Sequence, residues 1–104
     1  MKPSGRAGRK VDANQAAIIE ALEKTGATVQ TLGGVGDGCP DLLVGRLGFN
    51  VLLEVKGADG KLNEKQCAWH ASWRGQKAIV RDEYEAMAIV LKLSLEYAEK
   101  VGVT

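Results

Sequence analysis

The sequence predicts one domain of the α/β or α+β class, with its elements in the order α-β-β-β-α-β-α. Segments with apolar residues at helical spacing alternate with short β-branched runs, and this alternation is typical of mixed folds. Glycines stand at several of the junctions between these segments. With 104 residues, 45% of them hydrophobic, the chain can bury a single core without disulfides or structural metals.

The first 11 residues form a basic segment in which every charge is positive: Lys2, Arg6, Arg9 and Lys10. Because it also contains a proline and two glycines, this segment is predicted to be a flexible tail, followed by a single domain over residues 12–104. Contact with phosphates and plain solvation are both open interpretations of the tail.

The first helix is expected over residues 13–25, because Ile18 and Leu22 share one stripe. Residues 27–32 are β-branched enough for a strand. The glycine-rich run 33–38 is a loop, either a flap over a substrate groove or only a connection. It is not a phosphate-binding P-loop, because no Gly-Lys-Ser/Thr follows it.

A β-hairpin is predicted next, since two apolar runs flank Leu47–Gly48, which suits a tight turn. A hairpin that closes there pairs Arg46 with Phe49. Continuing the same register outward places Asp41 opposite Glu54.

A second helix is expected from about Asn63 to Arg74, with Gly75 ending it, and a short buried strand follows at 78–80. Asp82 has capping-box spacing to an acid three residues on, which predicts a last helix that continues to about residue 100. Apolar residues lie on two sides of this last helix, which favours a homodimer: Met87, Val90, Leu91 and Ala98 on one side, and Ala86, Ile89 and Leu93 on another.

The predicted hairpin brings two acids and a lysine together. Directly opposed residues on antiparallel strands have Cβ atoms about 4.5–5.5 Å apart, so the carboxylates of Asp41 and Glu54 would repel each other. A divalent cation between them is the simplest compensation. Lys56 points to the same face as Glu54, whereas Leu53 and Val55 point to the other. Such a face can hold a metal ion and an ammonium together.

These residues resemble the core of the PD-(D/E)xK nucleases, and a longer pattern resembles the VRR-NUC branch. The pattern comprises Gly38-Cys39-Pro40-Asp41-Leu42-Leu43-Val44-Gly45, Leu53-Glu54-Val55-Lys56-Gly57, Leu62 with Gln66, and Trp73-Arg74-Gly75. The resemblance implies a small stand-alone VRR-NUC protein with a restriction-endonuclease-like core, a mixed sheet with helices on both faces.

For function, the resemblance implies Mg²⁺- or Mn²⁺-dependent hydrolysis of DNA phosphodiesters by a homodimer, with branched DNA such as Holliday junctions as the substrate. Asp41, Glu54 and the backbone carbonyl of Val55 would bind the metal ion. Lys56 would orient the attacking water or stabilise developing negative charge. A bacterial or phage-type host is also implied.

The first helix departs from the family pattern. Many members supply an acid from this helix, whereas here Gln15 lies on the stripe of Ile18 and Leu22. Glu20 is about 140° away around the helix and is expected to face solvent. We infer that Gln15 takes the position of the acid, with Asp12 as a supplement. The alternative is that Gln15 only hydrogen-bonds a strand end.

The second helix carries three candidates. Gln66 matches a glutamine that borders the active site in the family, but Asn63-x-x-Gln66 is also capping-box spacing, and both interpretations stay open. We expect Trp69 and Trp73 to pack in the core rather than stack on bases. His70, the only histidine, is expected in packing or on the surface rather than as a general base.

Composition narrows the classes of function. The net charge of +1 is less basic than expected of a tight nucleic-acid binder. Cys39 and Cys67 are isolated, so neither a zinc site nor a disulfide framework is indicated. No apolar stretch approaches the roughly 20 residues that span a bilayer, and we expect an intracellular protein without an organic cofactor. Two alternatives stay open: a nucleic-acid-binding module without turnover, and a site-specific restriction or nicking enzyme.

Overall fold

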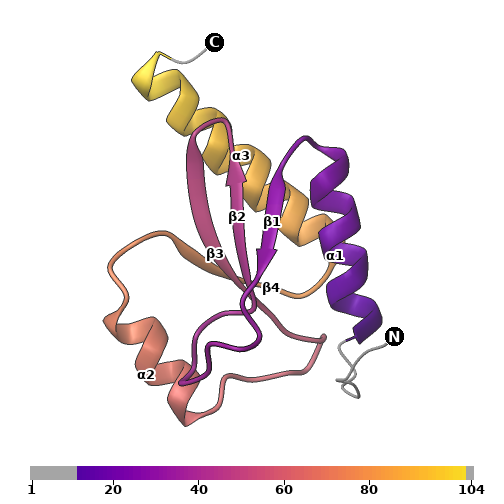
Figure 1. Ribbon diagram of the computed structural model, residues 1–104, viewed down its shortest axis with the longest axis vertical. Coiled ribbons are helices and arrows are strands. Elements are labelled where there is room, and N and C mark those ends of the chain that lie inside the picture. The colour runs from indigo at the N-terminus through magenta and orange to yellow at the C-terminus, as the bar shows by residue number, and fades with distance from the viewer. Residues whose placement is uncertain (1–11, 103–104) are drawn as a thin grey trace.

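The computed structural model describes residues 12–102, and the basic tail predicted over residues 1–11 lies outside them. The elements are α1 (Asp12–Lys24), β1 (Thr28–Thr31), β2 (Leu42–Arg46), β3 (Phe49–Val55), α2 (Glu64–Ser72), β4 (Lys77–Val80) and α3 (Glu83–Val101). Figure 1 shows their arrangement. Their order is the predicted one, and each element overlaps the range expected from the sequence.

The strands form one mixed sheet in the order β1-β2-β3-β4. The pairs β1–β2 and β2–β3 are antiparallel, and β4 runs parallel to β3. A parallel pair needs a long crossover, and the segment that contains α2 supplies it. A four-stranded mixed sheet flanked by helices confirms the predicted fold class.

The hairpin of β2 and β3 has the predicted register. It turns at Leu47–Gly48, where both residues have positive φ, 54° and 82°, as a type I′ turn requires. Arg46 pairs with Phe49, and the pairing continues to the residue after Asp41. One more step of the same register leads to Asp41 and Glu54, which therefore meet at the open end of the hairpin.

One face of the sheet is covered by α1 and α3, which pack against each other and against the strands (Figure 1). The hydrophobic core lies between them and comprises Ile18, Leu22, Ala27, Leu42, Val44, Phe49, Val51, Leu53, Val80, Ala86 and Val90. At its margin, the Arg46 guanidinium donates hydrogen bonds to Ser94 Oγ at 2.8 Å and to the Thr25 carbonyl oxygen at 3.2 Å. Arg46 thereby ties the hairpin to α3 and to the end of α1.

The opposite face of the sheet is largely open, so the expectation of helices on both faces is wrong for most of it. Thr28, Gln30, Leu43 and Asn50 are exposed on this face. The remaining helix, α2, lies below the centre of the sheet, near the end where β2 begins and β3 finishes (Figure 1). None of the residues of α2 is buried. A helix of this length covers only that end, which is where Glu54 lies.

The later helices begin at their predicted signals. Asn63 caps α2 and Asp82 caps α3, each through its side chain. However, α2 ends at Ser72, earlier than expected, and its C-cap is Trp73 in an extended conformation rather than Gly75. Among residues 12–102, we find no helix that combines the length and apolarity needed to cross a membrane.

Candidate active site

Two carboxylates meet where the hairpin opens. Asp41 directly precedes β2 and follows the buried Pro40. Glu54 is the second-to-last residue of β3. Asp41 Oδ2 accepts a hydrogen bond of 2.8 Å from the backbone N–H of Val55. This bond fastens the Asp41 side chain across the end of β3, where its negative charge acts on Glu54.

Glu54 is a buried acid. Its exposed fraction is 2%, on the face of the sheet opposite to the core residue Leu53. The pKa of Glu54 is raised from its ordinary value of 4.5 to about 8, chiefly by burial and then by the carboxylate of Asp41, against a lowering by Lys56. Near neutral pH, Glu54 therefore holds a proton that a bound cation would displace.

Gln66 completes the capping box of α2 and is also a neighbour of the buried acid Glu54. Its Oε1 accepts a hydrogen bond of 2.9 Å from the backbone N–H of Asn63, which completes the capping box. Its Nε2 donates to Glu54 Oε2 at 3.3 Å. The amide can do both because its acceptor and donor atoms are separate.

His70 also faces Glu54, a placement that the sequence reasoning missed. His70 Nε2 lies 3.7 Å from Glu54 Oε1, and the two side chains are 11% and 2% exposed. Neither atom has a hydrogen-bond partner within the described residues. Burial lowers the pKa of His70, and the ammonium of Lys77 lowers it further. The available signal was spacing: His70 follows Gln66 by four residues and so shares its helix face.

The glycine-rich loop 33–38 packs its last residue onto the start of α2. A Cβ on Gly38 would overlap the carbonyl oxygen of Lys65, and Gly38 has φ of +84°. This end of the loop is therefore a close-packed connection beside the site. Cys39 follows it and is half-buried, and burial, together with the charges of Glu54 and Asp41, raises the pKa of its thiol.

Lys56 stands on a well-fixed stretch of backbone. Its N–H donates to the carbonyl oxygen of Val80 at 3.1 Å. The Arg81 guanidinium then holds the following loop through two carbonyl oxygens, at 2.7 and 2.8 Å. Val55 is fixed by its pairing with β4 and by its bond to the acid before β2. The half-buried Lys56 side chain is close enough to Glu54 to lower its pKa.

From the first helix, Asn14 is the residue that hydrogen-bonds the end of β3. Asn14 Nδ2 donates to the carbonyl oxygens of Lys56 and Arg81, at 3.4 and 3.1 Å. Asn14 precedes the fully buried Ile18 by four residues and so lies on the same packed ridge. Gln15 is half-buried beside this ridge, and its side chain makes no hydrogen bond within residues 12–102. Its role in place of an acid stays a prediction.

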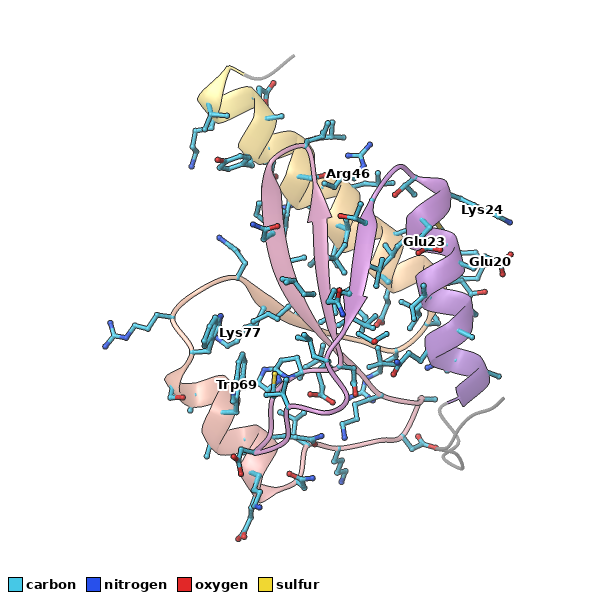
Figure 2. All side chains as sticks on the ribbon, viewed as in Figure 1. Glu20, Glu23, Lys24, Arg46, Trp69 and Lys77 are labelled. Carbon is cyan, nitrogen blue, oxygen red and sulfur yellow. The ribbon has the colours of Figure 1, made fainter. Side chains whose placement is uncertain are left out.

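Glu20 faces solvent, as predicted. It is 72% exposed and pairs with Lys24 at 3.7 Å. Figure 2 shows both side chains on the outer side of α1. Asp12, proposed as a supplement, is the first residue of α1.

The tryptophans are not in the core, so that expectation is wrong. Trp69 and Trp73 stack on each other, with ring centroids 4.8 Å apart and planes inclined by 15°. Trp73 is 43% exposed. Because the core lies on the other face of the sheet, helix α2 has no apolar interior to enter.

The donor atoms at this site suit a hard divalent cation. Mg²⁺ usually takes one or two carboxylates and keeps several waters. Asp41 and Glu54 supply two adjacent carboxylates, and Glu54 Oε1 is a buried oxygen without a hydrogen-bond partner in the described part of the chain. Among residues 12–102, no three His, Cys, Asp or Glu side chains are grouped so as to hold a metal ion. The residues present fit an ion that needs few protein side chains.

No protein-family model matches the sequence, and no curated protein matches it either. A solved structure described as a VRR_NUC domain is similar in fold, with a TM-score of 0.60 and 25% sequence identity. The match covers 73% of this chain and 88% of that one. The assignment of Asp41, Glu54 and Lys56 to the motif rests on the sequence. The structural match supports the predicted resemblance of this chain to VRR-NUC domains.

Proposed function

We propose that this protein is a metal-dependent DNA endonuclease that hydrolyses phosphodiester bonds in branched DNA. The observation that carries the proposal is the meeting of Asp41 and Glu54 at the open end of the hairpin, with Lys56 directly after β3. A buried acid at a polar end of a sheet lowers folding stability, and a cation-dependent role explains why it is there.

Each residue has a distinct role in this proposal. Asp41 and Glu54 hold the metal ion, together with the backbone carbonyl of Val55. Gln66 and His70 keep the carboxylate of Glu54 in place, because they approach its two different oxygens. Lys56 orients the attacking water or stabilises the negative charge that develops on the phosphate.

The metal ion, Mg²⁺ or Mn²⁺, would supply charge neutralisation at the phosphate and a more acidic water. Loading it requires that Glu54 lose its proton, so metal binding and deprotonation are coupled at this residue.

The test is a cleavage assay on supercoiled, linear and four-way-junction DNA with Mg²⁺, Mn²⁺ or EDTA. We expect metal-dependent cleavage, highest on the junction, that is lost in Lys56→Ala and kept in Glu20→Ala. Glu20 is the matched control because it is an exposed acid on the outer side of α1. Cleavage that persists in both Asp41→Ala and Glu54→Ala would refute the proposal. Metal-independent DNA binding without cleavage of any of the three substrates would favour the alternative, a nucleic-acid-binding module without turnover.

The contribution of the first helix is tested separately. We propose that Gln15 occupies the position of the family's acid, and Gln15→Glu should then tighten Mn²⁺ binding measured by calorimetry. Asn14→Asp is the comparison, because it removes the donor to the carbonyl oxygens of Lys56 and Arg81. It should lower the free energy of unfolding without raising the affinity for Mn²⁺. Unchanged Mn²⁺ affinity in Gln15→Glu would mean that Gln15 is structural.

We also propose a homodimer. Three apolar side chains near the end of α3, those of Leu95, Tyr97 and Val101, are 54%, 38% and 49% exposed after the chain has packed. Burial of Leu95, the most exposed of the three, against a second copy would remove apolar surface from water. Sedimentation should show a dimer that Leu95→Glu dissociates, and a monomer at all concentrations would contradict this part of the proposal.

A further inference from the structure

We propose that the stacked pair Trp69–Trp73 is a binding platform for unpaired DNA bases beside the catalytic carboxylates. The inference rests on the proposed nuclease function, because it assigns to α2 the part of the substrate that the metal site does not hold. It concerns a surface, defined here as the Trp platform: Trp69 and Trp73 with the neighbouring Lys65, Arg74 and Lys77.

The first observation is that Trp69 lies on α2, a helix without buried residues, and that Trp73 is the C-cap of this helix. Large aromatic side chains usually bury most of their area. Here Trp73 is 43% exposed, and its ring stacks on Trp69 with centroids 4.8 Å apart. The pair is therefore a preformed flat surface of aromatic rings that is open to solvent on one side. Nucleobases stack on such rings whatever their sequence, since every base has a π-face.

The second observation is the charge around the pair. Residues 61–77 contain four cationic side chains, Lys61, Lys65, Arg74 and Lys77, and one acid, Glu64. This segment therefore has a net charge of +3 in a chain whose total is +1. Lys65 pairs with Asp37 at 4.0 Å, but these side chains are 76% and 94% exposed, so the pair neutralises little charge. Cations around an aromatic platform favour a polyanion over an apolar protein surface.

The third observation is proximity to the site. Trp69 is adjacent to His70, with ring centroids 5.4 Å apart, and His70 Nε2 is 3.7 Å from Glu54 Oε1. Lys77 Nζ donates to the Trp73 carbonyl oxygen at 3.0 Å, so the start of β4 is tied to the platform. Figure 2 shows Trp69 on the side of α2 that faces Lys77. A strand whose bases stack here would pass next to the catalytic carboxylates.

A shallow hollow beside Trp69 adds room for such a strand. Its volume is about 320 Å³, and it is lined by Lys65, Ala68, Trp69 and Ser72 of α2 together with Asp37 of the glycine-rich loop. In an intact duplex, the faces of the bases are hidden by their neighbours in the stack. The platform therefore selects DNA with unpaired bases, such as forks, flaps and the opened centre of a junction, over plain duplex.

The test is equilibrium binding in EDTA, where no cleavage occurs, to three fluorescein-labelled substrates: a 20-base-pair duplex, a single strand and a fork with unpaired arms. The unmodified protein should bind the fork about tenfold more tightly than the duplex. Trp73→Ala should weaken fork and single-strand binding by about 5- to 100-fold, on the scale of one lost stacking contact, and change duplex binding less than twofold. Tyr84→Ala is the matched control, since Tyr84 is an exposed aromatic residue at the start of α3, and it should change none of the three.

A spectroscopic readout separates stacking from a structural effect. Trp69 and Trp73 are the only tryptophans, so intrinsic fluorescence reports on the platform alone. Single-stranded DNA should quench it, duplex should not, and Trp73→Phe should recover most of the fork affinity that Trp73→Ala loses. Equal weakening for fork and duplex, or fluorescence unchanged at saturating single strand, would overturn the inference.

The outcomes also separate this inference from the proposed function and from a protein partner. Metal-dependent cleavage that is indifferent to Trp73→Ala overturns the platform and leaves the nuclease intact. Fork binding that depends on Trp73, without DNA cleavage in the presence of either metal, overturns the proposed nuclease function and supports the platform. If Trp73→Ala converts a dimer to a monomer in sedimentation without changing fork binding, the pair is an interface between copies, and the inference is wrong.

Discussion

Burial has different effects on the two sides of strand β3. Leu53 and Glu54 are consecutive residues with exposed fractions of 0% and 2%, but they face opposite sides of the sheet. Leu53 packs between the sheet and the helices α1 and α3, where its burial stabilises the fold by roughly 1.5–3 kcal/mol. Glu54 is enclosed by Asp41, Gln66 and His70, and the same enclosure raises its pKa. Equal burial thus stabilises the fold on one side and opposes ionisation on the other.

This difference extends over the whole molecule. The covered side has a continuous apolar core with a polar margin at Arg46. The site side has a short helix without buried residues, a loop that packs on this helix at Gly38, and a stacked tryptophan pair of which Trp73 is exposed. Stability therefore comes mainly from one side of the sheet, and the other side is free to carry charged and aromatic groups.

The largest effects are expected from substitutions of Leu53 and Glu54. Leu53→Ala should lower the free energy of unfolding by about 2–5 kcal/mol, because it leaves a cavity in the core. Glu54→Gln should instead lower cleavage by about 10²–10³-fold and leave a folded protein. At pH 9, where the wild-type acid is ionised and buried, Glu54→Gln should be more stable than the wild type in urea unfolding. A Glu54→Gln protein that is less stable at pH 9 would show that the carboxylate supports the fold.

Stability and metal affinity should both depend on pH through the ionisation of Glu54. The pKa of Glu54 is about 8 when folded and 4.5 ordinarily, so the folded state binds the extra proton between these values. Without metal, stability should be highest below pH 4.5 as far as this group is concerned, and should fall as the pH rises toward 8. Metal affinity should show the opposite trend and rise about tenfold per pH unit between pH 6 and 8, since binding displaces that proton.

Calorimetry of Mn²⁺ binding in two buffers of different ionisation enthalpy measures this coupling directly. Close to one proton should be released per ion at pH 6.5, and close to none at pH 9. Glu54→Gln provides the control, because it removes the titrating group. Mn²⁺ affinity that is flat from pH 6 to pH 8 in the wild type would contradict the assignment of Glu54 as a metal ligand.

The next smaller effect concerns the loop on the site side. Gly38→Ala should separate the loop from α2, because the added Cβ overlaps the Lys65 carbonyl oxygen and φ is +84°. We expect a loss of about 1–3 kcal/mol and faster hydrogen exchange in α2, with weaker cleavage. Gly34→Ala is the matched control, since a Cβ there meets nothing within 4 Å. Equal exchange rates in the two variants would mean that the loop does not hold α2.

The parts of the fold that local rules determine could be predicted from the sequence. The turn at Leu47–Gly48 sets the register of the hairpin, and that register brings Asp41 to Glu54 without any tertiary information. The starts of α2 at Asn63 and of α3 at Asp82 are likewise predicted by capping chemistry, which acts within one helical turn. These predictions succeeded because each depends on neighbours in the chain.

The parts that failed depend on which side of the sheet a helix covers. Trp69 and Trp73 have the spacing of a core stripe, but periodicity does not say whether a core is within reach of that stripe. His70 shares a helix face with Gln66, but only the position of α2 brings that face to Glu54. Asn14 and Gln15 differ by 100° around one helix, and the packing of Ile18 decides which one reaches β3.

The smallest expected effect lies at the closed end of the hairpin, away from the site. Leu47 has φ of 54°, a left-handed conformation that costs a leucine about 1 kcal/mol and that asparagine tolerates. Leu47→Asn should therefore raise the free energy of unfolding by about 0.5–1 kcal/mol, while Gly48→Ala, at φ of 82°, should lower it. Urea unfolding measures both changes, and cleavage should stay within twofold of wild type in Leu47→Asn. Because Leu47 lies at the other end of β2 and β3 from Asp41 and Glu54, a larger change in cleavage would mean that strain in the turn is transmitted along the hairpin, and that its two ends are not independent.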